Sequence, residues 1–310
     1  MRNVQHKKEA YWFYRVLSIF YDKYVNPFFW TEGMRNEALA LGDFNSRELT
    51  VADVGSGTGF TTQGISKYVD ASNISCLDQS PHQMAYAKAR PELQQSHFQV
   101  GDAEDLPFET DHFDRYVSAG SIEYWPEPLR GIAESYRIIK PDGKALMIGP
   151  LRPRNWFARL MADTWMLFPE EEEYIKWYEE AGFVDIKKVN TAPKWVFKEK
   201  YAVALVGTKP KSGDSPANLP EKKIEDVAAK MTFNRRISFV WHLLIGNLAG
   251  FMFIPMAVVG YANYGLRKLF GRIPEKKKAV LNDRLTVHQR VSLATIVLMA
   301  VAAAWLAMAA

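Results

Sequence analysis

Between Leu49 and about Pro210, runs with the pattern of buried strands alternate with runs of helical pattern, and no other feature constrains the fold as strongly. Strand-like runs begin at Leu49 and Asn73, for example, and a helix-like run that starts at Phe60 separates them. Alternation at this spacing is typical of a parallel sheet with helices on both faces. We therefore predict an α/β fold, in which the run from Pro128 forms a helix that ends in a Pro-Asp-Gly turn.

The first predicted strand leads into a glycine loop with the sequence VADVGSGTG. Its glycines are Gly55, Gly57 and Gly59, a G-x-G-x-G spacing, whereas the dinucleotide fingerprint that meets a pyrophosphate is G-x-G-x-x-G. Asp53 stands two residues before the first glycine, and a carboxylate there disfavours a phosphate and favours a cationic ligand. The loop therefore predicts S-adenosylmethionine, which carries an ammonium and a sulfonium group, and the spacing does not fit the alternative of an NAD-dependent enzyme.

Two further acids follow at the expected ends of later strands, which is the edge where ligands bind in open α/β sheets. Asp78 follows Gly55 by 23 residues and is placed to accept hydrogen bonds from a ribose. Asp102 is placed to accept the amino group of an adenine, with the amide of Ala103 nearby for a ring nitrogen. The predicted cofactor-binding residues are Asp53, Gly55, Ser56, Gly57, Gly59, Asp78, Gln79, Asp102, Ala103 and Ser118.

These features, in this order, resemble the class I S-adenosylmethionine-dependent methyltransferases over residues 49–210. The resemblance implies a Rossmann-like fold with a mostly parallel seven-stranded sheet. The stretches DQSPHQ (78–83) and SAGSIEYWPEP (118–128) are not general motifs of that class. With others across residues 5–216, they resemble the chloroplast 2-methyl-6-phytyl-1,4-hydroquinone methyltransferases of plants and algae, also called MPBQ/MSBQ methyltransferases.

This closer resemblance implies a C-methyltransferase that acts on prenylated hydroquinones on the way to tocopherols and plastoquinone. It implies S-adenosylmethionine as the cofactor, a 2-methyl-6-phytyl- or 2-methyl-6-solanesyl-1,4-hydroquinone as the substrate, and the lipid of the plastid inner envelope membrane as a partner. The family's proteins usually end soon after one membrane helix, which residues 237–266 would match. The segment 267–310 goes beyond that pattern.

Ring methylation is an attack by an aromatic carbon on the sulfonium methyl group, and a base near a ring hydroxyl would assist it. His82, Glu123 and Tyr124 are the candidates, although His82 could equally stabilise the start of its helix. A prenyl tail needs an apolar channel, and some of the aromatic-rich residues could form a lid over it, while ordinary core packing explains most of them. These residues are Tyr11, Trp12, Phe13, Tyr14, Phe28, Phe29, Trp30, Trp156, Phe157, Trp165, Met166 and Phe168.

Charge and hydropathy separate the C-terminal third from the rest of the chain. Residues 209–310 carry a net charge of +9 and residues 1–208 one of −5. Residues 237–266 and 291–310 contain no Lys, Arg, Asp or Glu, and both are long enough for a helix that crosses a bilayer of about 30 Å. A basic tail beside apolar runs indicates anionic lipid headgroups rather than nucleic acid. The alternative is a pair of buried helices in a soluble domain.

The predicted organisation follows from these boundaries: 1–48, an aromatic-rich helical segment; 49–208, the methyltransferase domain; 209–236, a linker; 237–266, a transmembrane helix; 267–290, a basic loop; and 291–310, a possible second transmembrane helix. The N-terminus lacks the apolar core and cleavage site of a secretory signal and is too acidic and serine-poor for a transit peptide. The single cysteine excludes an intrachain disulfide, and the six histidines have no metal-ligand spacing.

Two alternative functions remain open at this point. One is a methyltransferase for a different lipid-like ring, as in ubiquinone or menaquinone synthesis. The other is a membrane scaffold that binds S-adenosylmethionine without catalysis, and the intact loop glycines and strand-end acids argue against it.

Overall fold

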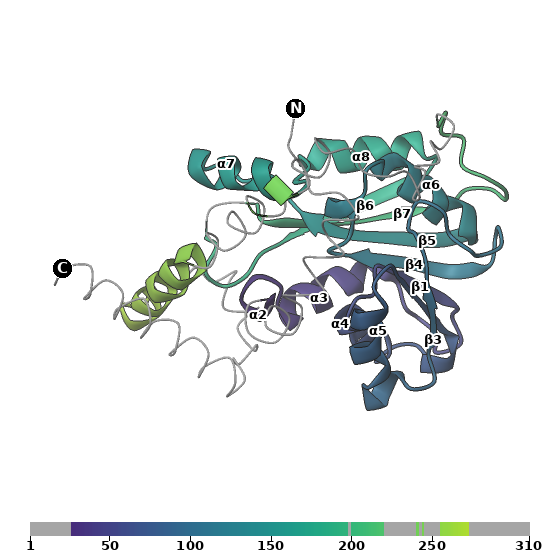
Figure 1. Ribbon diagram of the computed structural model, residues 1–310, viewed down its shortest axis with the longest axis horizontal. Helices are drawn as coiled ribbons and strands as arrows, with labels where there is room; N and C mark the ends of the chain where they lie inside the picture. The colour runs from purple at the N-terminus through teal and green to yellow at the C-terminus, as the bar shows by residue number, and fades with distance from the viewer. Residues whose placement is uncertain (1–25, 198–199, 220–239, 242–243, 245–254, 273–310) are drawn as a thin grey trace.

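The computed structural model describes residues 26–197, 200–219, 240–241, 244 and 255–272 (Figure 1). A single seven-stranded sheet, in the order β3-β2-β1-β4-β5-β7-β6, forms its centre. The pairs among β1 to β5 are parallel, and β7 is antiparallel to both β5 and β6. The strands are β1 (Val51–Val54), β2 (Ile74–Asp78), β3 (His97–Val100), β4 (Phe113–Ala119), β5 (Ile139–Pro150), β6 (Val184–Thr191) and β7 (Ala202–Thr208). The predicted α/β fold with a mostly parallel seven-stranded sheet is confirmed.

Helices cover both faces of this sheet: α6 and α8 lie on one face, and α3, α4 and α5 lie on the other (Figure 1). The α-helices are α2 (Asn26–Phe29), α3 (Glu32–Leu39), α4 (Phe60–Ile65), α5 (Pro81–Lys88), α6 (Pro128–Ile138), α7 (Trp156–Trp165) and α8 (Glu171–Glu180). Short 3-10 turns are η2 (Ala40–Gly42), η3 (Ala71–Asn73), η4 (Pro91–Leu93) and η5 (Ile122–Tyr124). Two of the α-helices begin with recognisable capping residues. Ser80 caps α5 ahead of Pro81, and Glu170 and Glu173 form a capping box on α8.

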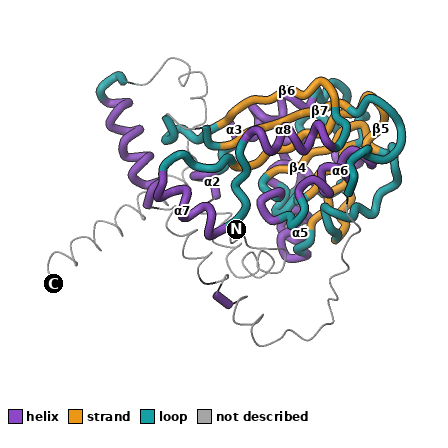
Figure 2. The backbone as a smooth tube through the Cα atoms, turned by 90° about the horizontal axis from the view of Figure 1, so that it is seen from above, coloured by secondary structure: helices purple, strands orange, loops and turns teal. Residues whose placement is uncertain are grey.

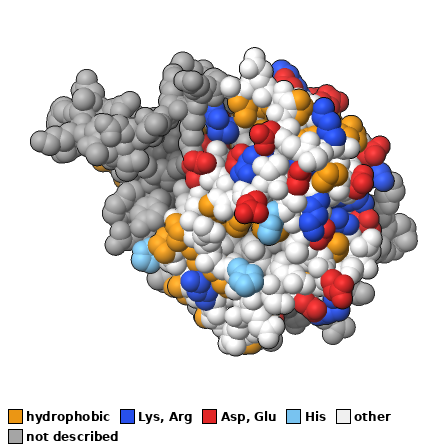
Figure 3. Space-filling view, turned by 90° about the vertical axis from the view of Figure 1, so that its right-hand side faces the viewer, with side chains coloured by type: hydrophobic (Ala, Val, Ile, Leu, Met, Phe, Trp, Pro, Cys, Tyr) orange, Lys and Arg blue, Asp and Glu red, His pale blue; other side chains and the backbone are white. Residues whose placement is uncertain are grey.

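The core forms two buried clusters, one on each face of the sheet. One includes Tyr136 from α6 and Tyr174 and Tyr178 from α8, all fully buried. The other includes Leu39 from α3 and Ile65 from α4. Strands β1 and β7 between them are buried at almost every residue, because both of their faces are covered. On the face turned to the viewer in Figure 3, Lys and Arg side chains are interspersed with Asp and Glu side chains.

The structure differs from the sequence prediction at the end of α6. The helix ends at Ile138, and β5 begins at the next residue instead of after the Pro-Asp-Gly turn. Pairing of β5 with β4 is interrupted and resumes at Lys144, so residues 140–143 form an irregularity within the strand, with Asp142 at φ +63°. Asp142 and Gly143 exchange backbone hydrogen bonds with Lys209, which keeps this segment in the sheet.

The first residues of the predicted linker, 209–217, pack against the domain. Lys209 is fully buried; its Nζ donates to Asp111 Oδ1 at 2.5 Å and lies 4.7 Å from the centre of the Tyr136 ring. Farther along, Ser215 Oγ donates to the carbonyl of Ala181 at 2.9 Å. A buried lysine needs a partner, and Asp111 supplies one.

A helix of residues 255–269 also packs on the domain, next to α2. Tyr261 is buried and its hydroxyl donates to the carbonyl of Phe28 at 3.2 Å, while Gly260 lies against the ring of Trp195. Figures 1 and 2 both show this helix at the same end of the molecule as α7. Residues 267–269, predicted to start the basic loop, continue the helix.

Within the described residues, no helix has both the length and the apolar character needed to cross a bilayer. Of the two predicted transmembrane segments, 291–310 lies outside the described residues, as does most of 237–254. The aromatic residues of the predicted lid at positions 11–14 lie outside them as well.

Candidate active site

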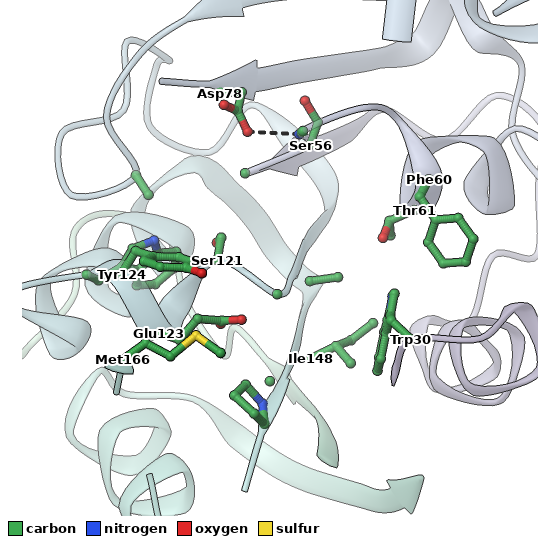
Figure 4. A pocket seen from close by; sticks show the side chains of 18 of the residues that line it. Trp30, Ser56, Phe60, Thr61, Asp78, Ser121, Glu123, Tyr124, Ile148 and Met166 are labelled. Atoms are coloured by element: carbon green, nitrogen blue, oxygen red, sulfur yellow. Dashed lines mark hydrogen bonds between the residues drawn. The ribbon is translucent and has the colours of Figure 1, made fainter. Parts of the chain in front are cut away.

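A cavity of about 370 Å³ opens at the carboxyl ends of the parallel strands. Because β7 is antiparallel, its beginning reaches the same edge, so six strands contribute to the wall. Figure 4 shows the arrangement: Ser56 and Asp78 on one side, Ser121, Glu123 and Met166 on another, and Trp30 and Phe60 across the space. The main lining segments are 29–30, 55–58, 60–61, 77–80, 101–103, 119–121, 123–125, 148–151 and 200–202, with Gln83, Pro153, Met166 and Phe168.

The glycine loop after β1 owes its path to backbone conformations that favour glycine. Gly55, Gly57 and Gly59 have φ values of +72°, +53° and +78°. A Cβ at Gly55 would also lie 2.4 Å from the Cβ of Ser121, so no side chain fits between the loop and the end of β4. The amides of Gly55 and Ser56 both donate to the carbonyl of Leu77, which holds the loop against β2.

Asp78 is the last residue of β2 and lines the cavity with a buried carboxyl group. Its Oδ2 accepts the amide of Gly57 at 2.8 Å, drawn as the dashed line in Figure 4, and its Oδ1 accepts the amide of Ser80 at 2.7 Å. Burial raises the pKa of Asp78, and the hydrogen bonds from Ser80 and Gly57 oppose that rise. Each oxygen keeps a lone pair for a ligand, so this acid is fixed in place and still able to accept.

Gln79, Asp102 and Ala103 also line the cavity, as do Ser56 and Gly57. Asp102 Oδ1 accepts the amide of Glu104 at 2.9 Å, which fixes the turn after β3. Seven of the ten predicted cofactor-binding residues therefore meet around one space.

The other three, Asp53, Gly59 and Ser118, lie behind the cavity wall. Asp53 is fully buried beneath the loop, where Thr62 Oγ1 donates to its Oδ2 at 2.5 Å, and burial raises its pKa to about 7. Gly59 precedes α4, and a Cβ there would lie 2.8 Å from Leu93 and 3.0 Å from Ala87.

Ser118 supports the wall from below. Its Oγ lies 2.7 Å from Ser121 Oγ, which itself lines the cavity next to Gly55.

The three predicted base candidates separate clearly. Glu123 and Tyr124 line the cavity, whereas His82 is exposed in the first turn of α5 and does not. Glu123 is 7% exposed, and its Oε2 has no hydrogen-bond partner among the described residues. Burial raises the pKa of the Glu123 carboxyl to about 7.

Apolar side chains from distant parts of the chain form another wall. Phe29 and Trp30 come from the N-terminal segment, and Met166 and Phe168 come from the segment after α7. The amide of Leu167 donates to the carbonyl of Glu123 at 3.1 Å, which ties that segment to η5. Of the predicted lid residues, Trp156 is 73% exposed and does not line the cavity.

Sequence reasoning missed Ser121, Lys200 and Tyr201 as lining residues. Lys200 Nζ donates to both carboxylate oxygens of the buried Glu171 at 3.0 Å. No motif surrounds Lys200 and Tyr201, because they reach the cavity only through the antiparallel placement of β7. Ser121 carried a signal, since it lies inside the SAGSIEYWPEP stretch.

The two walls fit S-adenosylmethionine beside an apolar aromatic molecule. The loop and the acids Asp78 and Asp102 offer acceptors for an ammonium group, ribose hydroxyls and an adenine amine, with no cluster of basic side chains for a phosphate among the lining residues. The aromatic wall offers an apolar surface next to a single carboxyl, Glu123.

Residues 52–147 match the protein family described as "Methyltransferase domain". The chain is 52% identical over 262 residues, 83% of this chain and 77% of the relative, to "2-methyl-6-phytyl-1,4-hydroquinone methyltransferase, chloroplastic" of Arabidopsis thaliana. It is 33% identical over 111 residues, 35% of this chain and 44% of the relative, to "Demethylmenaquinone methyltransferase" of Chlorobaculum parvum.

Among solved structures, one chain of the complex between the Haloferax volcanii Trm112 methyltransferase activator and a methyltransferase superposes with a TM-score of 0.53. That match is 21% identical and covers 64% of this chain and 95% of the other, so it shows a shared fold. The identity of 52% over most of both chains shows more than a fold. The chain belongs to the 2-methyl-6-phytyl-1,4-hydroquinone methyltransferase family and is an S-adenosylmethionine-dependent methyltransferase.

Proposed function

We propose that this enzyme methylates a ring carbon of a 2-methyl-6-prenyl-1,4-hydroquinone, with a phytyl or solanesyl chain, in tocopherol and plastoquinone synthesis. The observation that carries the proposal is the 52% identity, over 83% of the chain, to a relative named for the phytyl substrate. The cavity supports it, because a polar wall for the cofactor and an apolar wall for a prenylated ring face one space.

On the cofactor side, we assign Asp78 to the ribose hydroxyls and Asp102 with Ala103 to the adenine. The glycine loop lies against the amino acid part, and the carboxyl group of Asp53 is buried behind the loop. When bound, S-adenosylmethionine supplies a methyl group on a positively charged sulfur, already a strong electrophile. The protein's main task is therefore to hold the ring at the correct distance and angle.

On the substrate side, Phe29, Trp30, Met166 and Phe168 offer apolar surface to the prenyl chain. Burial of such a chain contributes about 0.8 kcal/mol per CH₂. A hydroquinone is electron-rich and can attack the methyl group, whereas the oxidised quinone is electron-poor and cannot. The preferred substrate is therefore the reduced ring with its long chain.

Product analysis with methyl-labelled S-adenosylmethionine tests this proposal. The panel contains 2-methyl-6-phytylhydroquinone, its solanesyl counterpart, both quinones, a chain-free methylhydroquinone and a demethylmenaquinol, the ring type named in a more distant relative. We expect carbon-methylated products from the first two compounds only. Equal turnover of the chain-free compound would remove the case for a lipid pocket, and methylation on oxygen would contradict the proposed reaction.

We propose in addition that the enzyme works at the plastid inner envelope membrane, where a prenylated substrate resides. The relative named above as chloroplastic supports the organelle. The outer side of the helix 255–269 supports the membrane: Leu266 is exposed, Leu269 is 81% exposed, and Lys268, next to Leu269, is exposed as well. Apolar side chains interspersed with cations are typical of surfaces that bind anionic lipid.

Vesicle flotation tests the membrane proposal. The full-length protein should float with vesicles that contain anionic lipid, and the double variant Leu266→Glu, Leu269→Glu should float less. Val184→Glu is the matched control, because Val184 is an exposed apolar residue at the sheet edge opposite the cavity. Equal loss in both variants would argue against this surface.

A further inference from the structure

We propose that Glu123 is the general base of the reaction and accepts the proton of a ring hydroxyl of the substrate. This inference rests on the proposed function. It concerns a residue of the cavity wall to which we assign no contact with the cofactor.

The position of Glu123 carries the proposal. Its side chain points into the cavity beside Met166 (Figure 4), on the wall that includes the apolar side chains. It is more than nine-tenths buried, and its Oε2 has no hydrogen-bond partner among the described residues. An unpaired buried carboxyl oxygen costs free energy unless a ligand completes it. A hydroxyl group on a substrate ring is a donor of the right kind.

The surrounding structure holds this carboxyl in place. Glu123 lies in η5, after the fully buried Ile122 and two residues before the buried Trp125. The Trp125 ring packs against Gly131, where an added Cβ would lie 2.5 Å from the ring. The carbonyl of Glu123 accepts the amide of Leu167 at 3.1 Å, which joins η5 to the segment after α7. A base must lie at a fixed distance from the proton it accepts, and this framework provides that.

The other side chains of the cavity are less suited to the role. His82 does not line the cavity, and Asp78 already accepts two amides on the cofactor side. Lys200 is ion-paired with Glu171, and that contact engages its amino group. Tyr124 offers a phenolic hydroxyl, which is both a donor and an acceptor, whereas an ionised carboxyl group is an acceptor only.

The reaction balances as follows. Glu123 takes the hydroxyl proton as the ring carbon forms its bond to the methyl group and the carbon–sulfur bond breaks, with that electron pair remaining on sulfur. The methylated carbon then loses its own proton to water, which restores the aromatic ring. The ring oxygen recovers its proton from Glu123, so the carboxylate is regenerated and one proton is released per methyl group.

The electrostatic surroundings fit a base that works near neutral pH. Burial raises the pKa of Glu123, and its own backbone amide partly opposes the rise. The titratable groups that share the cavity wall are Asp78, Asp102, Tyr124, Lys200 and Tyr201. From α8, Tyr174 lies behind the wall, and the Glu123 charge contributes to the raised pKa of its phenol.

The test compares Glu123→Gln with the wild-type enzyme on 2-methyl-6-phytylhydroquinone, without oxygen so that the substrate stays reduced. The kcat/KM of the wild type, which reports the free enzyme, should rise with pH to a plateau, with an apparent pKa near 7. Loss of the base should lower kcat by about 100-fold or more at neutral pH. In this variant the rate should no longer rise around pH 7. It should rise instead as the substrate's own phenol ionises, at a pH of about 10.

Two controls separate this role from a structural one. Glu123→Asp keeps a carboxyl and should retain part of kcat and the pH limb. Binding of S-adenosylhomocysteine by calorimetry should be unchanged in Glu123→Gln. Infrared spectroscopy gives a readout without turnover. Raising the pH from 6 to 8 should reduce the absorbance of protonated carboxyl groups, and this loss should be smaller in Glu123→Gln than in the wild type.

A Glu123→Gln enzyme within threefold of wild-type kcat, or one with the same pH limb, would overturn the inference. Such a result would leave the proposed function intact, because the wild type would still methylate the substrate. A wild type that methylates none of the prenylhydroquinones would contradict the proposed function instead.

Discussion

Asp78 and Glu123 are both buried carboxyl groups in the wall of one cavity, yet their surroundings differ. Asp78 ends β2 and accepts two backbone amides, one from the glycine loop and one from the cap of α5. Glu123 lies beyond the end of β4 in η5, and its Oε2 has no partner among the described residues. Hydrogen bonds to the ionised form favour the charged state, and burial without them favours the neutral state.

The difference indicates that the two carboxyl groups have different roles. A carboxylate that the backbone holds in one orientation suits a constant task, such as accepting the hydroxyls of a ribose. A carboxyl group whose pKa burial raises to near neutral pH can both accept and release a proton, which suits a proton transfer. The four predictions below test this contrast, from the largest expected effect to the smallest.

Gly57→Val should abolish the fixed geometry of Asp78. At φ +53° a β-branched residue is strained by about 1–3 kcal/mol, and the amide that donates to Asp78 would shift. We expect affinity for S-adenosylhomocysteine to fall by about 100-fold or more, which corresponds to about 2.7 kcal/mol. Calorimetry measures it. Gly57→Asn is the matched control, since Asn tolerates positive φ better and should lose less.

Asp78→Ala should weaken S-adenosylhomocysteine binding by about 10- to 100-fold, because a hydrogen bond to a charged group contributes about 1.5–3 kcal/mol. Glu123→Gln should leave that affinity within twofold. The two variants, measured side by side by calorimetry, separate the two carboxyls. An unchanged affinity in Asp78→Ala would mean that the ribose lies elsewhere.

The pH dependence of stability should differ between the wild type and Glu123→Gln. The pKa of Glu123 is raised from an ordinary 4.5 to about 7, so between these values the folded protein binds more protons than the unfolded chain. The free energy of unfolding therefore falls as the pH rises through this window. At 1.36 kcal/mol per pKa unit, the effect of one group is about 1–3 kcal/mol.

Denaturant unfolding at pH 5 and pH 8 measures this effect. The difference between Glu123→Gln and the wild type should shift in favour of the variant by about 1–3 kcal/mol from the lower to the higher pH. Asp53, whose pKa is also raised to about 7, is present in both proteins and cancels. A constant difference between the two proteins would show that Glu123 titrates at an ordinary pKa.

His82→Ala should have the smallest effect. His82 is exposed and outside the cavity, so stability should change by about 0.5 kcal/mol or less. The values of kcat and KM should stay within twofold. A tenfold loss of kcat in a steady-state assay would return His82 to the list of base candidates and weaken the assignment to Glu123.

Much of this architecture could be predicted from the sequence, because it depends on residues that are close together along the chain. The alternation of apolar runs predicted the parallel sheet, and the G-x-G-x-G spacing marked the positions where positive φ occurs. The acids Asp78 and Asp102 were placed at strand ends by counting residues, and both line the cavity. Local rules sufficed here because strand ends of a parallel sheet share one edge.

Tertiary structure alone decided the rest. His82, Glu123 and Tyr124 were all base candidates in the sequence, with Glu123 and Tyr124 favoured as pocket lining. Only the packing of η5 against β5 and the segment after α7 distinguishes a buried unpaired carboxyl from an exposed imidazole. The end of α6, the contacts of Lys209 with Asp111 and Tyr136, and the packing of the helix 255–269 on Phe28 join residues far apart along the chain. Burial and pairing depend on such distant neighbours, so the sequence determined the sheet and the cofactor edge, and the fold determined which carboxyl faces the substrate without a partner.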